Sequence, residues 1–234
     1  MSITRALAMA CPACGVELHA TVVDSLNAGR HPHLRAELLA RRLHLFGCGA
    51  CGEPVAVDKS LVYVDFERGQ LFLAAPLAAR GSGTEAAWEE AAVRLFTRWL
   101  RDDAPAVMRQ RAGTFAVRLC FGLEELREKV VIDEAGLDDG VIEVLKAALL
   151  MAEPRFEAEG VAALSLDGVD ERGGLRFVAP PSGLVARVEP GVYARVEAHG
   201  DVLPPELRLD GGPWRSLVGR AAIAADAGEE RTGG

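Results

Sequence analysis

Four cysteines in two close pairs are the residues of this sequence whose types and spacing are most specific for one kind of chemistry. The first pair is Cys11-Pro-Ala-Cys14, and the second, after 33 intervening residues, is Cys48-Gly-Ala-Cys51. In a tight turn, two cysteines separated by two residues can direct both sulfurs at one point, and the glycine after each pair suits such a turn. Two such turns predict a tetrahedral site made of four thiolates.

The chemistry that fits this site is the binding of one structural zinc ion by Cys11, Cys14, Cys48 and Cys51. Because protein sulfurs would fill all four positions of a tetrahedral zinc, no position remains for a reactive water, and a hydrolytic zinc is not expected. The alternative interpretation is a pair of redox-active dithiols. The spacing favours zinc, and we predict no other cofactor and assign no catalytic residue.

The segments on both sides of each cysteine pair have the pattern of short strands. Residues 3–10 are expected to enter the first turn, and residues 16–23 alternate with a period of two as they leave it. Residues 43–46 are expected to run extended into the second turn, and residues 55–57 to lead out of it. Each turn between two strands then forms one knuckle of a zinc ribbon.

A helical insert and a hairpin complete the predicted first domain, residues 1–80. Pro32 stands at a suitable first helical position, and leucines at positions 34, 38 and 39 share one face, which predicts a helix over residues 32–40. Residues 61–66 and 71–75 flank a turn and predict a hairpin that continues the sheet of this domain.

These features together resemble the CpXC family of bacterial and archaeal proteins. The resemblance rests on the two cysteine pairs, on Asn27 with residues 32–39, and on these segments: Leu61-Val-Tyr-Val-Asp65, Ala75-Pro76, Glu125-Leu-Arg-Glu-Lys-Val130 and Gly136-Leu-Asp-Asp-Gly-Val-Ile-Glu143. The family often has proline after the first cysteine of the second pair, where this sequence has Gly49; this departure changes the stiffness of the turn but not the ligands. The resemblance covers residues 1 to about 150. It implies a zinc-ribbon-type start and no established biochemical activity.

The middle region, residues 81–153, is predicted to be mainly helical. Apolar residues of its first helix recur at intervals of three and four: Trp88, Ala91, Leu95, Phe96, Trp99 and Leu100. These aromatic residues could belong to a core or to a surface where two domains dock. A strand is expected over residues 114–121, followed by a helix over about 123–134 that is charged on one side, and by a helix from a cap at Asp138 to Leu150.

The chain from Pro154 onward changes to short extended runs separated by glycine, proline and aspartate. The runs cover residues 161–166, 175–178, 183–189 and 192–197. They predict a β-rich subdomain over residues 154–219, whereas the alanine, glycine and charged residues of 220–234 predict a disordered tail. The predicted fold class is therefore α+β, with a four-cysteine zinc ribbon that carries a helical insert, a mixed helical middle and a β-rich C-terminal part.

Composition and charge narrow the class of protein. The 234 residues are 50% hydrophobic and 26% charged with a net charge of −8, which is ordinary for a globular protein and unfavourable for one that mainly binds nucleic-acid phosphates. Cysteines in metal-type pairs indicate a reducing compartment. No segment approaches the roughly 18–20 apolar residues that span a bilayer, and the apolar start is too short for a signal peptide. We expect a soluble, cytoplasmic protein that does not bind membranes.

Other side chains could also act in catalysis or metal binding, but each has a simpler structural explanation. Cys120 on a predicted strand could be a nucleophile or a small buried side chain, and the spacing favours burial. His19, His31, His33 and His44 could include a second metal site at His31-Pro-His33, but no carboxylates accompany them. The pairs Glu124/Glu125 and Asp138/Asp139 stand at predicted helix starts, where capping explains them.

Three functions from different classes remain after the sequence analysis. The leading hypothesis is a zinc-stabilised, non-enzymatic adaptor that recognises another protein, because the one strong motif builds a surface without a reactive centre. The second is nucleic-acid recognition through a basic face over residues 30–44, which contains Arg30, Arg35, Arg41 and Arg42. The third is an enzyme that uses Cys120 or the histidines. The sequence identifies neither the partner nor the oligomeric state.

Overall fold

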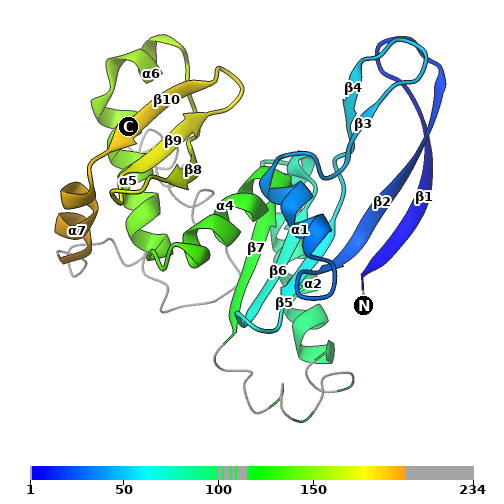
Figure 1. Ribbon diagram of the computed structural model, residues 1–234, viewed down its shortest axis with the longest axis horizontal. Helices are drawn as coiled ribbons and strands as arrows, with labels where there is room; N and C mark the ends of the chain where they lie inside the picture. Colours follow the sequence, from blue (N-terminus) through cyan, green and yellow to red (C-terminus); the bar gives the residue numbers. More distant parts are fainter. Residues whose placement is uncertain (1, 100–101, 103–105, 107–108, 110–114, 199–234) are drawn as a thin grey trace, which may run out of the picture. The chain divides into compact units, whose positions relative to one another are not determined.

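The computed structural model describes residues 2–99, 102, 106, 109 and 115–198. Predictions for Leu100, for residues 199–219 and for the tail over 220–234 lie outside the described residues. The described residues form two compact units, the first ending at Leu126 and the second beginning at Arg127. Both helices and strands occur in each unit (Figure 1), which confirms the predicted α+β class.

The first unit is built on a five-stranded mixed sheet. Its strands, in spatial order, are β1 (Ile3–Ala10), β2 (Glu17–Asn27), β5 (Leu61–Asp65), β6 (Gln70–Ala75) and β7 (Ala116–Phe121). The pairs β1/β2 and β5/β6 are antiparallel, whereas β2/β5 and β6/β7 are parallel. The predicted hairpin of β5 and β6 is confirmed, with Gly69 in a left-handed conformation (φ 67°) at its turn.

A small ribbon of two strands carries the second cysteine pair. It consists of β3 (Leu45–Gly47) and β4 (Pro54–Ala56), which pair in antiparallel fashion. Figure 1 shows this ribbon beside the turn end of the β1–β2 hairpin. The helical insert is confirmed as α1 (Pro32–Leu39), which begins at its proline and buries Leu38. The sequence pattern therefore predicted both knuckles and the helix between them.

The helix α2 (Glu85–Arg98) packs against one face of the first unit's sheet. Ala92 is buried among sheet residues, and Trp88 packs on the same cluster. Trp99 stacks on Phe66 with ring centroids 5.9 Å apart. The two tryptophans thus contribute to the packing of this unit, whereas Leu95, predicted on the same apolar face, is 40% exposed.

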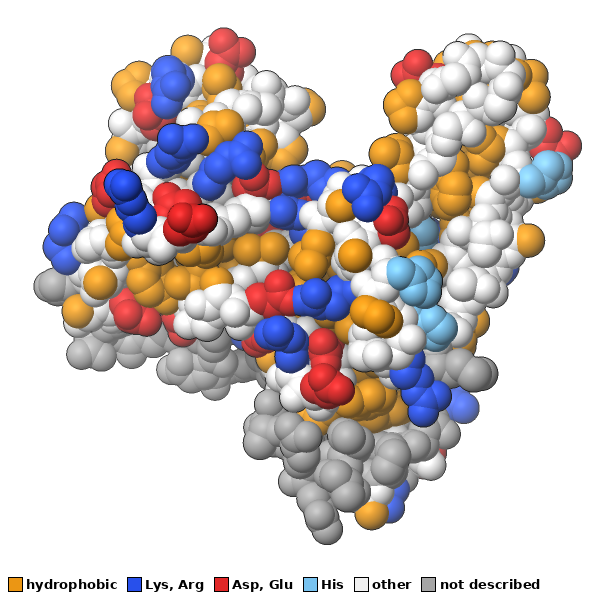
Figure 2. Space-filling view, in the orientation of Figure 1, with side chains coloured by type: hydrophobic (Ala, Val, Ile, Leu, Met, Phe, Trp, Pro, Cys, Tyr) orange, Lys and Arg blue, Asp and Glu red, His pale blue; other side chains and the backbone are white. Residues whose placement is uncertain are grey.

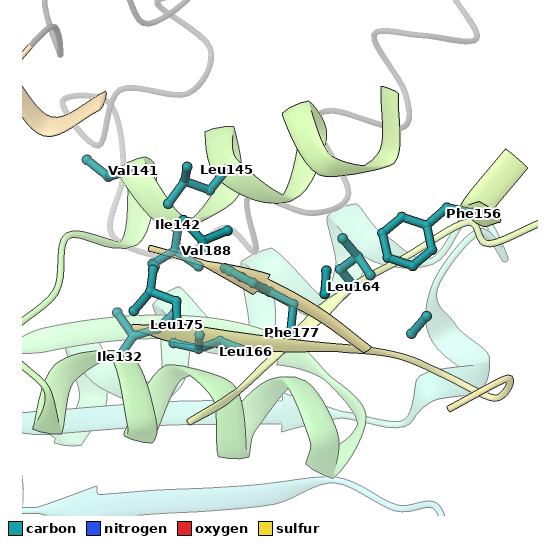
Figure 3. Packing of buried hydrophobic residues seen from close by; sticks show 12 residues of the cluster. Ile132, Val141, Ile142, Leu145, Phe156, Leu164, Leu166, Leu175, Phe177 and Val188 are labelled. Atoms are coloured by element: carbon teal, nitrogen blue, oxygen red, sulfur yellow. The ribbon is translucent and has the colours of Figure 1, made fainter. Parts of the chain in front are cut away.

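The second unit combines helices with a three-stranded antiparallel sheet. The helix α4 (Gly122–Glu134) belongs to this unit from Arg127 onward. The other elements are α5 (Asp139–Ala152), α6 (Pro154–Ala158), β8 (Ser165–Val169), β9 (Leu175–Ala179), β10 (Leu184–Val188) and α7 (Pro190–Ala198). The sheet order is β10-β9-β8. Figure 3 shows Ile142 and Leu145 of α5 directed at the sheet, where Phe177 is completely buried. One cluster of twelve buried apolar residues forms this core.

One predicted strand of the C-terminal part is wrong. The sequence pattern predicts an extended run over residues 192–197, but these residues form most of helix α7. The helix places Val192, Tyr193 and Val196 against the core cluster, and Pro190 at its start is compatible with the first helical turn. Tertiary packing thus overrides the weak alternating pattern of this segment.

A chain of buried charges connects α4, α5 and β8. Lys129 donates to Asp139 (2.6 Å) and Glu143 (2.9 Å), and Lys146 donates to Glu143 and Glu128 (both 3.0 Å). The other carboxylate oxygen of Glu128 accepts the backbone N–H of Leu166 at 2.6 Å. All five charged side chains are at most 6% exposed. Alternation of opposite charges compensates for their removal from water.

Candidate metal centre

The first knuckle lies between β1 and β2. The N–H of Cys11 donates to the carbonyl of Val16 at 2.9 Å, and the N–H of Gly15 donates back to the carbonyl of Cys11 at 2.8 Å. Gly15 has φ 74°, a conformation that costs glycine little and other residues more. This turn holds Cys11 and Cys14 on the same side of the chain.

The second knuckle repeats this geometry between β3 and β4. Cys48 donates its N–H to Glu53 at 2.9 Å, Gly52 donates to Cys48 at 2.8 Å, and Gly52 has φ 76°. The same hydrogen bonds form although Gly49 stands in place of proline. The departure at Gly49 therefore leaves the turn unchanged.

The four sulfurs converge as the sequence predicted. All four Sγ atoms lie within 4.8 Å of one another. The distance is 3.8 Å between the sulfurs of Cys11 and Cys51 and 3.7 Å between those of Cys14 and Cys48. Zinc–sulfur bonds of about 2.3 Å at tetrahedral angles separate sulfurs by about 3.8 Å. The cluster therefore has the dimensions of a tetrahedral metal site.

The electrostatics of the cluster also favour a cation among the sulfurs. Backbone N–H groups of Cys51 and Ala50 lower the pKa of Cys48 to about 6. At Cys51, the N–H of Glu53 acts in the same direction, but the neighbouring sulfurs of Cys14 and Cys48 outweigh it and raise the pKa to about 12. Four thiolates repel one another at these distances, and a divalent cation would remove that repulsion.

The donor set fits a metal that prefers thiolate ligands, such as zinc or iron.

The sequence matches a known protein family over more than half of its length. Residues 9–146 match the family model described as CpXC protein. This chain belongs to the CpXC family. No curated protein and no solved structure matches it significantly.

The histidines of the CpXC chain do not join the cysteines. Of the groups that the structure describes, only the four cysteines bring three or more possible metal ligands together. The rings of His31 and His33 contact each other edge to face, with centroids 5.8 Å apart, at the start of α1. The histidine His44 is buried, and its Nε2 accepts the backbone N–H of Val23 at 2.9 Å.

Two of the four arginines of the predicted basic face, Arg41 and Arg42, bind carboxylates. Arg41 binds both carboxylate oxygens of Glu124 at 2.7–3.1 Å, and Arg42 binds both oxygens of Glu37 at 2.9–3.0 Å. Figure 2 shows acidic and basic side chains interspersed on the face in view. These two arginines are paired within the chain, which makes them less available for phosphate groups.

The other candidates are not members of the cysteine cluster. Cys120 is fully buried on β7, as expected for a small core residue. Asp138 caps α5 by accepting the N–H of Val141 at 2.9 Å, which confirms the capping prediction at this position. Capping does not fully explain the neighbouring acids, because Asp139 binds buried Lys129 and Glu125 binds Arg80.

A pocket of about 280 Å³ in the first unit escaped the sequence analysis. Its walls are mainly apolar, and its lining includes Leu38, Leu43, Leu45, Val57, Leu77 and Phe121. Arg41 and His44, the two non-glycine residues with positive φ among those described, also line it, with φ of 58° and 62°. Such backbone strain often occurs at functional sites. No local periodicity could reveal this pocket, because four separate segments form it.

Proposed function

We propose that this CpXC protein is a zinc-stabilised, non-enzymatic binding protein of the cytoplasm that recognises another protein. In this proposal Cys11, Cys14, Cys48 and Cys51 bind one structural zinc ion. The observation that carries the proposal is the convergence of four sulfurs at tetrahedral distances, because four protein ligands complete the coordination of zinc. The metal then stabilises a surface and does not activate water.

The apolar pocket of the first unit supports the binding part of the proposal. Two of its lining residues, Leu45 and Leu77, are 44% and 56% exposed. Exposed apolar side chains around a concavity are typical of surfaces that bind proteins. Among the described helices, none has the length and apolar character needed to cross a bilayer.

Capture from native lysate tests this function. The tagged full-length protein, loaded with zinc, is used with and without nuclease, and a captured protein is identified and then bound again in purified form. We expect a nuclease-resistant protein near stoichiometric amount. Its binding should weaken in Leu77→Glu, which changes the pocket, and persist in Val93→Glu, which changes an exposed residue of α2 outside the pocket. Recovery of nucleic acid alone, or of nothing, would remove the proposal.

A further inference from the structure

Three arginines surround a depression of about 550 Å³ in the second unit. Its lining consists of Arg155, Arg176 and Arg187 together with Glu153, Leu149, Val185 and Ala186. This concentration of positive charge occurs in a chain whose net charge is −8. Figure 2 shows basic side chains gathered over the sheet of this unit.

The arrangement of two of these arginines is electrostatically unfavourable in isolation. Arg176 on β9 and Arg187 on β10 are direct partners in the antiparallel register, and both are exposed. Like charges directly opposite each other on neighbouring strands destabilise a sheet. An anion placed between them would relieve that repulsion.

The carboxylates near the depression do not balance its arginines. Glu153 binds Arg155 through both oxygens at 2.9 and 3.2 Å. Asp167 is shared between Arg176 and Arg127. Within the described part of the chain, Arg187 makes no ion pair or side-chain hydrogen bond, but it interacts electrostatically with Asp170, whose lowered pKa reflects backbone hydrogen bonds first and then Arg172 and Arg187. The three arginines therefore share the charge of Glu153 and part of the charge of Asp167 and Asp170, which leaves an excess of positive charge at this surface.

We infer that this depression is a docking surface for an acidic peptide segment of a protein partner. The guanidinium group matches the planar, bidentate geometry of a carboxylate, and arginine is enriched in protein interfaces. The apolar side chains of Leu149 and Val185 provide contact for an aliphatic side chain between two acidic ones. A polyphosphate chain fits less well, because it has no aliphatic group to place against these apolar side chains.

This surface belongs to the second unit, whereas the apolar pocket and the cysteines belong to the first, so it extends the proposed function. The inference rests on the proposed function in one respect, which is that the ligand is a protein. Short synthetic peptides test it directly, and their result does not depend on whether the zinc ribbon binds a partner.

The experiment measures fluorescence anisotropy of a labelled eight-residue peptide of alternating glutamate and leucine, titrated with the full chain. We expect binding that weakens as salt is added, because charge attraction drives it. The double variant Arg155→Gln/Arg187→Gln should weaken binding by about tenfold or more, the equivalent of about 1.4 kcal/mol. The control Arg94→Gln removes the same kind of charge from an exposed position of α2 outside the depression and should leave binding unchanged.

Two further measurements separate peptide binding from a structural role of these arginines. The single variant Arg187→Gln should keep the melting temperature, because it removes both the repulsion from Arg176 and the attraction to Asp170, while it weakens peptide binding. A labelled peptide of alternating lysine and leucine should not bind. Equal binding of both peptides, unchanged affinity in the double variant, or tighter binding of a single-stranded oligonucleotide through the same arginines would overturn the inference.

Discussion

The cysteine end of the first unit and the core of the second unit are stabilised by different means. Around the sulfurs, the buried cluster contains only Cys11, Leu18, Ala20, Cys48 and Val55. The second unit buries twelve apolar residues in one cluster and, beside them, a continuous chain of five charges. The first region has specific chemistry and little apolar core, and the second has a large core and no comparable group of metal ligands among its described residues.

This difference indicates which of the two regions needs a ligand to fold: the cysteine end, which has the smaller core. A small core cannot offset the conformational entropy of ordering its strands, and small metal domains obtain the missing free energy from their metal. In zinc-finger peptides this amounts to about 10–16 kcal/mol. A large core can instead retain buried ions, provided that every ion has partners. Variants that act on one region and leave the other intact test this comparison.

The largest effect is expected from Cys48→Ser, which should lose the metal and the fold of the cysteine end together. Hydrogen exchange followed by mass spectrometry should show rapid exchange in β1–β4 and unchanged protection in α5 and β9. The matched control is Cys120→Ala, which removes a buried thiol outside the cluster and should keep the full metal content. A Cys48→Ser protein with wild-type metal content and protection would be incompatible with the account.

The second effect concerns the buried charges. Lys146→Met leaves Glu128 and Glu143 without one of their cations, and removal of one member of a buried ion pair costs about 3–5 kcal/mol. Urea unfolding monitored by hydrogen exchange should show this loss in α4 and α5, without loss of metal. The exposed pair of Arg155 and Glu153 provides the contrast, since Arg155→Gln should change stability little. Equal effects of the two variants would show that the buried charges have no special role.

A smaller effect is expected at the turn after Cys51. An added Cβ at Gly52 meets no atom within 4 Å, so Gly52→Ala should cost only the strain of its positive φ, about 1–2 kcal/mol. Gly49→Ala in the same turn also meets no neighbour and lacks the positive φ, so it should cost much less. Thermal unfolding with zinc held constant measures both. A greater loss in Gly49→Ala would contradict the described turn.

The smallest effect is a pH dependence at His44. Burial lowers the pKa of its imidazole, so the folded protein remains neutral there while the unfolded chain binds a proton near pH 6.5. The first unit should therefore lose stability as the pH falls below about 6.5. Asparagine tolerates positive φ, so His44→Asn should reduce this dependence. An identical pH profile of wild type and variant in urea unfolding would contradict this assignment.

The sequence predicted the parts of the fold that local patterns specify. The spacing of Cys11, Cys14, Cys48 and Cys51 indicated one site, and the apolar stripe of Val141, Ile142 and Leu145 indicated α5. These signals suffice because they are local: each cysteine pair lies within one turn of the chain, and the apolar stripe lies on one helical face.

The remaining features depend on distant partners that no local pattern reveals. Glu128, Lys129 and Lys146 are charged residues that would ordinarily face water, and only α4, α5 and β8 together provide the counter-charges that allow burial. The segment of α7 alternates weakly like a strand, but its contacts with the core determine a helix. The depression with Arg176 and Arg187 becomes visible only when the register of β9 and β10 is known.

The most direct test of the central claim is the metal content and metal environment of the purified full-length protein. Elemental mass spectrometry combined with X-ray absorption at the zinc edge measures both quantities. We expect one zinc per chain with four sulfur neighbours at about 2.3 Å. A folded protein without metal, or a metal with nitrogen or oxygen among its neighbours, would contradict it.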